Sequence, residues 1–307
     1  MPRDPSPLPP HLAGAPFTVS AALASGVPPH RLRCGDLQRE FHGVRAPRSE
    51  LRGLSDRCRL LLTGKPENWA IGGATAARLH GLPLPRELET DTRLHVVAIG
   101  GANAPDGRGL CGSRTKRALP VVMKNGVRVL APEYAWASLA GLVWSDVALL
   151  VAGERLWDRF EPLVSVDAVD AMLGDLRNWK GIARLRAARV RMMPGTHSPR
   201  ETRLRLRLED DGVPTGVPNG RIELVGGEVF YGDLVLYEYR LVFEYDGEYH
   251  GEEAQRGRDA RRLNALGSEG WLPVCFTRYD SFSSQLRQAR RALRSRGWYP
   301  TGENAES

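Results

Sequence analysis

Two apolar segments near the C-terminal end, residues 229–236 and 241–245, restrict the possible folds of this chain most strongly, because an acidic residue interrupts each of them. Asp233 lies in the first segment and Glu244 in the second. Burying an unpaired charge in a strand is costly, so such residues indicate a compensating partner or a function. Asp246 follows Glu244 by two residues, so both side chains leave a strand on one face. If the segments pair as a hairpin, three carboxylates meet at one end of a sheet.

Carboxylates gathered in this way repel one another, and a divalent cation is the usual compensation. Mg²⁺ prefers oxygen ligands and keeps several of its waters. A cation bound in this way can activate water and neutralise charge on a phosphate group during hydrolysis. We therefore expect a site for Mg²⁺ (or Mn²⁺), with Asp233 and Glu244 as the metal ligands.

The surrounding sequence predicts a three-layer α/β unit over residues 196–300. Ser198 and Pro199 are typical of a helix start, and Gly270 of a helix end. In chain order we expect a helix at 198–208, strands at 221–225, 228–236 and 240–246, a helix at 259–269, a strand at 271–277 and a helix at 283–296.

Four motifs occur in this region in a definite order. They are Ser198-Pro-x-Glu-Thr202, Gly232-Asp-Leu234, Val242-Phe-Glu-Tyr-Asp-Gly-x-x-His250 and Arg258-Asp-x-x-Arg-x-x-x-Leu-x-x-x-Gly-Trp271. Together they resemble the endonuclease-like domain related to very-short-patch-repair endonucleases, a group within the PD-(D/E)XK nuclease superfamily. The resemblance implies a restriction-endonuclease-like fold, in which helices flank a mixed sheet, and a metal-dependent nuclease activity.

The resemblance also implies individual roles. Glu201 matches the helix glutamate that supports the site, and Asp233 matches the metal-binding aspartate. Asp246 stands where the superfamily pattern has a lysine, and no lysine follows Lys180. The very-short-patch group also lacks this lysine and relies on histidine, so His250 is the expected residue for proton transfer. The implied catalytic residues are Glu201, Asp233, Glu244, Asp246 and His250, with Asp259 and Arg262 in support.

Several of these residues also have a purely structural explanation, and the sequence leaves both open. Ser198 followed by Glu201 is also a capping box at a helix start. Asp246 followed by glycine is also a hairpin-turn signal. Asp259 and Arg262 are three residues apart on a predicted helix, which is the spacing of a surface ion pair. Asp233 also suits an edge strand, and a lone His250 suits a surface.

The first 195 residues divide into segments that differ in composition. Residues 1–15 are proline-rich and predicted to be disordered, as is the tail at 301–307. Residues 16–50 have two short helices and then a strand, the order of a winged helix-turn-helix. Residues 161–195 are predicted to be a helical linker, with a helix at 167–191. Residues 51–160 indicate a small α+β domain, with a helix within 69–83, strands at 94–99 and 127–130, and helices at 132–142 and 147–157.

Residues 16–160 resemble, less sharply, the AbiEi-type antitoxins of abortive-infection systems. The residues that carry this resemblance lie at 17–23, 30–32, 41–44, 75–83 and 132–140. It implies DNA binding by the winged helix, with Arg31, Arg33 and Arg39 as phosphate contacts. A structural role, in which this region packs on the nuclease domain, is the alternative.

Charge and cysteine content narrow the possible partners and compartment. The net charge of +7 favours an anionic partner, and the basic excess lies in the first 194 residues. The four cysteines form no CxxC pair, so we expect free thiols in a reducing cytoplasm rather than a disulfide framework or a zinc site. We see neither a signal peptide nor an apolar run long enough to span a membrane, so no membrane partner is expected.

Two functions follow from these observations. The first is a Mg²⁺-dependent DNA endonuclease with an N-terminal DNA-binding region, acting in DNA repair or in defence against phages and mobile elements. The second is a catalytically inert DNA-binding regulator or antitoxin-like protein with a nuclease fold, which the missing lysine favours. The sequence does not give the DNA target or the oligomeric state, for which a dimer is one open alternative.

Overall fold

The computed structural model describes residues 5–101, 103–246, 253–277 and 279–300, with only the backbone of 246 and 253–260. The chain folds into two compact units. Unit 1 contains Met1–Leu149 and Val169–Leu185, and unit 2 contains Leu150–Ala168 and Arg186–Ser307. Residues of the predicted linker, 161–195, are therefore divided between the two units. The finer domain boundaries expected from the sequence stay predictions.

Unit 1 begins with a small module around a three-stranded antiparallel sheet of order β1-β3-β2. Its elements are α1 (Pro10–Ala13), β1 (Phe17–Thr18), α2 (Val19–Ala24), the 3-10 helix η1 (Arg31–Arg33), β2 (Leu37–Gln38) and β3 (Val44–Pro47). Thr18 caps α2 by accepting the Ala21 N–H, and Gly26, with a φ of 80°, turns the chain after the helix. The predicted order of two helical segments and a strand is confirmed, although the second segment is a single 3-10 turn.

The predicted disorder of residues 1–15 is wrong for α1. Leu12 is only 5% exposed and belongs to the core of this module, together with Phe17, Ala22 and Leu37. The proline content misled the prediction, because Pro10 occupies the first turn of α1, where a missing N–H costs nothing.

The rest of unit 1 is built on a five-stranded sheet of order β6-β5-β4-β8-β7. Around it lie the helices whose apolar faces form the core with the sheet. The elements are η2 (Arg48–Glu50), α3 (Leu54–Leu62), β4 (Trp69–Ile71), α4 (Gly73–His80), α5 (Arg86–Glu89), β5 (Leu94–Ala98), β6 (Leu110–Arg114), β7 (Val121–Lys124), β8 (Val127–Leu130) and α6 (Pro132–Leu139).

The predictions for this region were right for several buried elements but missed two others, since no helix was expected at α3 and no strand at β4. The strands expected at 94–99 and 127–130 are β5 and β8. Within 69–83 the helix begins only at Gly73, because residues 69–71 form β4. The single helix expected at 167–191 is two helices, α8 (Val166–Asp175) and α9 (Ile182–Arg191), and they are separated at Asn178 and Gly181, which have positive φ angles of 60° and 83°.

Unit 2 contains the acidic segments and has the predicted order α-β-β-β-α-β-α. Before this series come the end of α7 (Asp146–Glu154), which begins in unit 1, and the 3-10 helix η3 (Arg155–Trp157). The series itself is α10 (Pro199–Asp210), β9 (Val217–Glu223), β10 (Val229–Leu236), η4 (Tyr237–Tyr239), β11 (Leu241–Asp246), α11 (Glu253–Ser268), β12 (Leu272–Thr277) and α12 (Phe282–Arg294).

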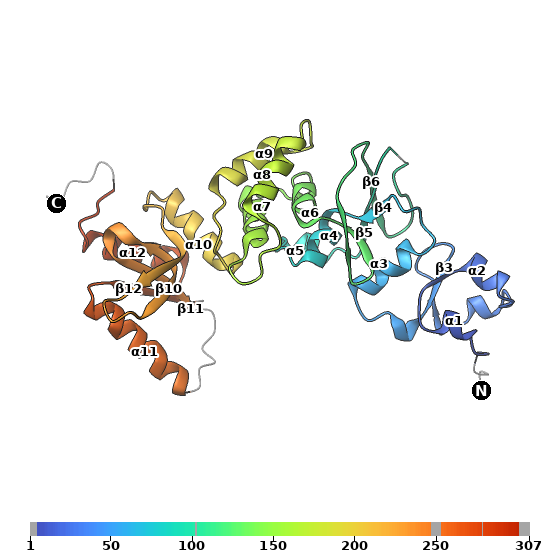
Figure 1. Cartoon of the computed structure of the whole chain (residues 1–307), viewed down its shortest axis with the longest axis horizontal. Helices are drawn as coiled ribbons and strands as arrows, with labels where there is room; N and C mark the ends of the chain where they lie inside the picture. The colour runs from blue at the N-terminus through green and yellow to red at the C-terminus, as the bar shows by residue number, and fades with distance from the viewer. Residues whose placement is uncertain (1–4, 102, 247–252, 278, 301–307) are drawn as a thin grey trace. The chain divides into compact units, whose positions relative to one another are not determined.

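The sheet of unit 2 has the order β12-β11-β10-β9 and is mixed, because β11 and β12 are parallel while the other pairs are antiparallel. One face packs on α10 and α12 through Leu208, Leu293 and Phe243. The other face packs on α11 through Leu266 and Val242. Figure 1 shows α11 and α12 on opposite faces of this sheet. The unit is therefore three-layered.

A buried ion pair connects the end of α7 to α10. Glu154 is 0% exposed and Arg205 is 2% exposed, and their charged groups are directly bonded. Glu154 also accepts hydrogen bonds from the Met193 N–H at 2.8 Å and from the hydroxyls of Thr202 and Thr196 at 2.7 and 3.2 Å. Burial raises the pKa of Glu154, and the charge of Arg205 opposes that rise. The carboxylate thus fixes the start of α10 against the segment before it.

Across the described residues, the chain has three sheets and 12 α-helices, so the expected multidomain α/β class is confirmed at this level. None of the helices in that part of the chain has the length and apolarity needed to cross a bilayer.

We expect Arg205→Met to lower the free energy of unfolding by about 3–5 kcal/mol, because it leaves the charge of Glu154 buried and unpaired. Arg207→Met is the matched control: this arginine is exposed on the same helix and stacks on Phe282, so its loss should cost less than about 1 kcal/mol. Urea unfolding followed by circular dichroism measures both. The double variant Glu154→Gln/Arg205→Met should recover much of the loss, and no recovery would contradict the assignment of that loss to an unpaired charge.

Candidate functional site: an acidic cluster with two arginines

At Asp233, the side chains of strand β10 stop alternating regularly between the two faces of the sheet. A Cβ atom added to Gly232 would lie 2.8 Å from Cγ2 of Val235, so these two residues face the same side although they are three apart. Opposite them in β9, Asn219 has a left-handed φ of 50°. The register of the two strands is the same on both sides of this point, with Gly232 opposite Gly220 and Leu234 opposite Pro218, so the irregularity is a local twist of both strands and adds no residue to either. Here it directs Asp233 toward β11, where its Oδ2 accepts the Tyr245 N–H at 2.8 Å.

Glu244 lies in β11, between β10 and β12, and its side chain is 16% exposed. Its Oε1 accepts a hydrogen bond of 2.5 Å from Nη2 of Arg262 on α11. The same nitrogen also donates to the Tyr231 carbonyl oxygen at 2.6 Å. Arg262, expected from the sequence in a supporting position, therefore holds the second acid of the predicted metal site.

Glu201 lies in the first turn of α10 and has the capping role that the sequence left open. Its N–H donates to Oγ of the N-cap Ser198 at 3.2 Å, and its Oε2 accepts the His197 N–H at 2.9 Å. In the same turn, Arg200 lies over the ring of Tyr245 in β11 at 5.7 Å. The cap thus sits beside the strand that carries Glu244, so the structural and functional interpretations of Glu201 are compatible.

Arg159 is a member of the cluster that sequence reasoning missed. Its Nη1 lies 3.9 Å from Oδ1 of Asp233 and donates to Oδ1 of Asn219 at 2.9 Å. The preceding Asp158 fixes this loop by accepting the N–H groups of Phe160 and Glu161 at 2.9 Å each. No motif marks Arg159 in the sequence, because it is far from the other residues along the chain and follows a helix without a recognisable pattern.

The pKa values show that these groups act on one another. Burial raises the pKa of Glu244 to about 7. The charge of Arg262 lowers this pKa, and the charge of Asp233 raises it further. Arg159 also lowers it and Glu201 also raises it, each by less. Burial also raises the pKa of Glu201, again with a contribution from Asp233. Three of the predicted acids and two arginines therefore share one electrostatic environment.

Three of the predicted site residues have side chains that the structure does not describe. Asp246 ends β11 and Asp259 lies in α11, but their side chains are outside the described part of the chain. His250 lies outside the described residues. Arg31, predicted to contact DNA, is 4% exposed, and its guanidinium bonds both oxygens of Asp36 at 2.9 and 2.7 Å. A guanidinium that is buried and forms two hydrogen bonds with Asp36 cannot reach a phosphate, so that prediction is wrong.

The exposed arginines of the same module, Arg33 and Arg39, keep the predicted access to a phosphate. Their predicted role in binding DNA stays a prediction.

The three acids are spread more widely than the ligands of a formed metal site. Among the described side chains, one group of three has ligand atoms that all lie within 4.8 Å of one another, and it consists of Asp91, His95 and Cys111 in unit 1. Glu201, Asp233 and Glu244 do not form such a group. A cation held by all three acids would therefore need these side chains to move closer together.

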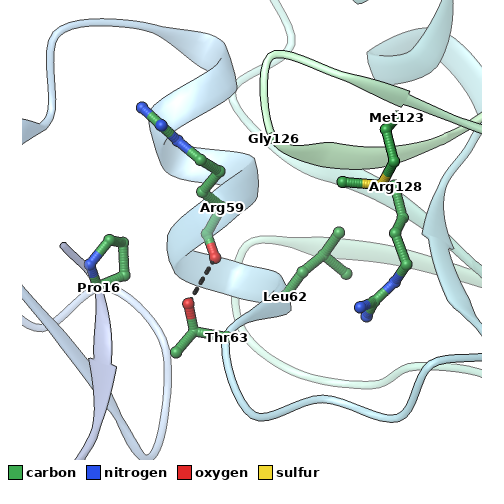
Figure 2. Close-up of a pocket in the computed structure, with 7 residues that line it drawn as sticks. All are labelled: Pro16, Arg59, Leu62, Thr63, Met123, Gly126 and Arg128. Atoms are coloured by element: carbon green, nitrogen blue, oxygen red, sulfur yellow. Dashed lines mark hydrogen bonds between the residues drawn. The ribbon is translucent and has the colours of Figure 1, made fainter.

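The chain also has a pocket of about 220 Å³ in unit 1, whereas the acidic cluster belongs to unit 2. Figure 2 shows its lining, in which Thr63 donates its hydroxyl to the Arg59 carbonyl oxygen. Both arginines of the lining have partners, since Arg59 pairs with Asp56 and Arg128 donates to two carbonyl oxygens. The pocket therefore presents no group suited to catalysis. Its lining residues are Pro16, Arg59, Leu62, Thr63, Met123, Gly126 and Arg128.

Comparisons of the chain with protein-family models, with curated proteins and with solved structures found no match.

The raised pKa of Glu244 makes stability depend on pH. Its folded pKa of about 7 exceeds its ordinary value of 4.5, so the folded state keeps a proton that the unfolded state releases. The stabilisation that the folded state gains from protonated Glu244, relative to its ionised form, is complete below about pH 4.5 and is lost as the pH rises through about 7. We expect Glu244→Gln to gain on the order of 2 kcal/mol relative to the wild type between pH 5 and pH 8.

Urea unfolding at the two pH values measures this difference. The matched control is Glu228→Gln, an exposed acid between β9 and β10, which should show no such change. If the pair with Arg262 dominates instead, Glu244→Gln will lose stability relative to the wild type as the pH rises, which would contradict the assignment.

Proposed function

We propose that unit 2 is a DNA endonuclease that hydrolyses phosphodiester bonds with the help of Mg²⁺ or Mn²⁺. The observation that carries the proposal is the partly buried cluster of Glu201, Asp233 and Glu244, whose two strand residues lie where the pairing of β10 with β11 ends. Desolvation and repulsion from Asp233 both oppose the ionisation of Glu201 and Glu244, and a bound cation would favour their charged forms. The resemblance of the four sequence motifs to very-short-patch-repair endonucleases supports the same function.

The donor set fits a hard divalent cation. Carboxylate oxygens from two neighbouring strands, Asp233 and Glu244, would hold the ion, and Glu201 would support it or its waters. When bound, the cation would lower the pKa of a water molecule and neutralise charge on the phosphate. The fit is consistent with the raised pKa of Glu244, since a nearby positive charge is what would favour its ionised form.

Arg159 and Arg262 are suited to bind the DNA phosphate beside these acids. Arginine stays charged at all working pH values and forms paired hydrogen bonds with phosphate oxygens. Arg159 is only loosely paired with Asp233, at 3.9 Å, and Arg262 is 32% exposed. In the proposed enzyme, both guanidiniums stabilise the charge that develops on the phosphate, a part of the work that the missing lysine does elsewhere.

A histidine is the proposed proton carrier, and the chain offers two. His250 is the residue that the sequence motif assigns. His197 is a second candidate beside Glu201, because its Nδ1 is held by Oδ2 of Asp158 at 2.9 Å and its side chain is 50% exposed. A carboxylate at Nδ1 fixes the ring orientation and leaves Nε2 to exchange a proton with water.

Unit 1 is proposed to hold the DNA through Arg33 and Arg39, which are exposed in the winged-helix-like module. The protein would then act in the cytoplasm, in DNA repair or in defence against foreign DNA. The oligomeric state is left open.

A second candidate function is an inert DNA-binding regulator with a nuclease fold. The observation that favours it is that Arg262 and Arg159 already compensate Glu244 and Asp233. An acidic cluster neutralised by arginines needs no cation. The two candidates differ in whether the acids are needed for chemistry or only for structure.

We expect the wild type to nick or cleave supercoiled DNA with Mg²⁺ or Mn²⁺ and not with EDTA. Asp233→Asn and Glu244→Gln should reduce the rate by at least about a hundredfold, because each removes a charged ligand of the cation. Glu228→Gln, an exposed acid in the same unit, should keep the rate of the wild type. His250→Gln and His197→Gln identify the proton carrier by which of them loses activity.

Equal cleavage by the wild type and both acid variants would rule out this site. If the wild type shows no cleavage of supercoiled, linear, mismatched or single-stranded DNA but still binds DNA, the inert regulator is correct.

A further inference from the structure

Unit 1 contains a second cluster of ligating side chains, which the proposed nuclease function does not use. Asp91 precedes β5, His95 lies within β5, and Cys111 lies in β6. His95 and Cys111 are direct partners in the parallel pairing of these strands, so their side chains leave the sheet on the same face. One ligand atom from each of the three residues lies within 4.8 Å of the other two.

The imidazole of His95 has a polar atom with no hydrogen-bond partner among the described residues. Its side chain is 9% exposed, and its Nε2 is buried without a partner. The nearest carboxylate oxygen, Oδ2 of Asp91, lies 3.7 Å away, which is too far for a hydrogen bond. Buried polar atoms are almost always satisfied, so an orphaned nitrogen that faces an acid and a thiol points to a missing partner.

The arrangement suits chelation better than nucleophilic catalysis. A Cys-His-Asp relay needs the two ring nitrogens to face opposite ways, one toward the thiol and one toward the acid. Here Nδ1 faces Gly73, since a Cβ atom there would lie 2.6 Å from it. Gly73 also has a positive φ of 50°, so a side chain at this position is disfavoured twice. The backbone of α4 is thus shaped around the ring, and Thr75 fixes the strand by accepting the His95 N–H at 2.9 Å.

We propose that Asp91, His95 and Cys111 bind a zinc ion in unit 1. Thiolate, imidazole and carboxylate are the three donor types that zinc accepts in proteins, whereas Mg²⁺ and Ca²⁺ take oxygen ligands. Two negative ligands and one neutral ligand balance the charge of Zn²⁺. Three protein ligands leave the fourth tetrahedral position for water or a substrate. Zinc bond lengths of about 2.0–2.3 Å bring ligand atoms to roughly 3.5 Å from one another, so the cluster contracts on binding.

Arg93 is the group that competes with the metal. It bonds both oxygens of Asp91, with its Nε at 3.1 Å from Oδ1 and its Nη2 at 2.8 Å from Oδ2, but its own side chain is 59% exposed and free to turn toward solvent. Zinc binding therefore requires Arg93 to release at least one oxygen. Removing Arg93 should therefore strengthen metal binding, which is not expected of a cluster with a purely structural role.

The test uses the full chain and Co²⁺, whose bond to a thiolate gives a charge-transfer absorption. The purified wild type should contain one zinc per chain by elemental analysis. After zinc removal it should bind Co²⁺ with this absorption. Cys111→Ser should lose the absorption, and Asp91→Asn should weaken Co²⁺ binding at least about tenfold. Arg93→Gln should bind Co²⁺ more tightly than the wild type. The matched controls Cys34→Ser and Glu244→Gln should leave the absorption unchanged.

A second measurement needs no variant. Bound zinc should protect Cys111 of the wild type from alkylation by iodoacetamide, and chelation should expose it, as mapped by mass spectrometry. The proposal is overturned if the wild type contains no zinc and shows no cobalt absorption, if Cys111→Ser keeps that absorption, or if chelation leaves the alkylation of Cys111 unchanged. Failure of this test leaves the nuclease proposal intact, because Glu201, Asp233 and Glu244 belong to the other unit.

Discussion

The buried carboxylate of Glu154 is the constraint on which the organisation of unit 2 depends. A charge with no exposed surface is tolerated only in an arrangement that satisfies it, and here one guanidinium, two hydroxyls and one backbone N–H do so. Two of these partners, Thr202 and Arg205, lie on α10, so the helix cannot rotate or slide without leaving a charge unpaired. Glu201 lies one residue before Thr202, and its place beside β11 is therefore set by an ion pair outside the acidic cluster.

The acids of the cluster are satisfied much less completely than Glu154. Among the described residues, Glu244 accepts from one guanidinium, and Asp233 accepts one backbone N–H and forms a loose pair with Arg159. Both lie in strands that also supply core residues, such as Val235 and Val242. Glu154 thus has the character of a structural acid, with every bond in place, while Glu244 and Asp233 have capacity left for a further partner. The number of hydrogen bonds that each carboxylate accepts therefore distinguishes a structural acid from a candidate functional acid better than its burial does.

The sequence predicted the elements of unit 2 well, because each is either a strand with an apolar core face or a helix with clear start and stop residues. Asp233 and Glu244 stood out in the sequence as charges within apolar strands, whereas Glu201 and Arg262 were assigned through the resemblance, and the structure places all four near one another. Their roles stay predictions. The sequence could not identify Arg159, which joins the cluster only through the tertiary fold. The strands β6 and β7 were missed because they are largely exposed and lack an alternating pattern. Arg31 was assigned to DNA because sequence alone does not show that Asp36 holds its side chain inside.

The absent lysine restricts which step the described side chains can perform. Arg159 and Arg262 supply positive charge, but a guanidinium does not release its proton at any working pH, so neither can activate a water molecule. Proton transfer must then fall to an imidazole or a carboxyl group. Glu244 has a pKa of about 7 and would otherwise qualify, yet a cation on its oxygens competes with the proton for the same lone pairs. Glu244 can therefore hold either the metal or the proton. In a metal-dependent reaction at this site, proton transfer falls to a histidine or to Glu201, whose pKa is also raised by burial.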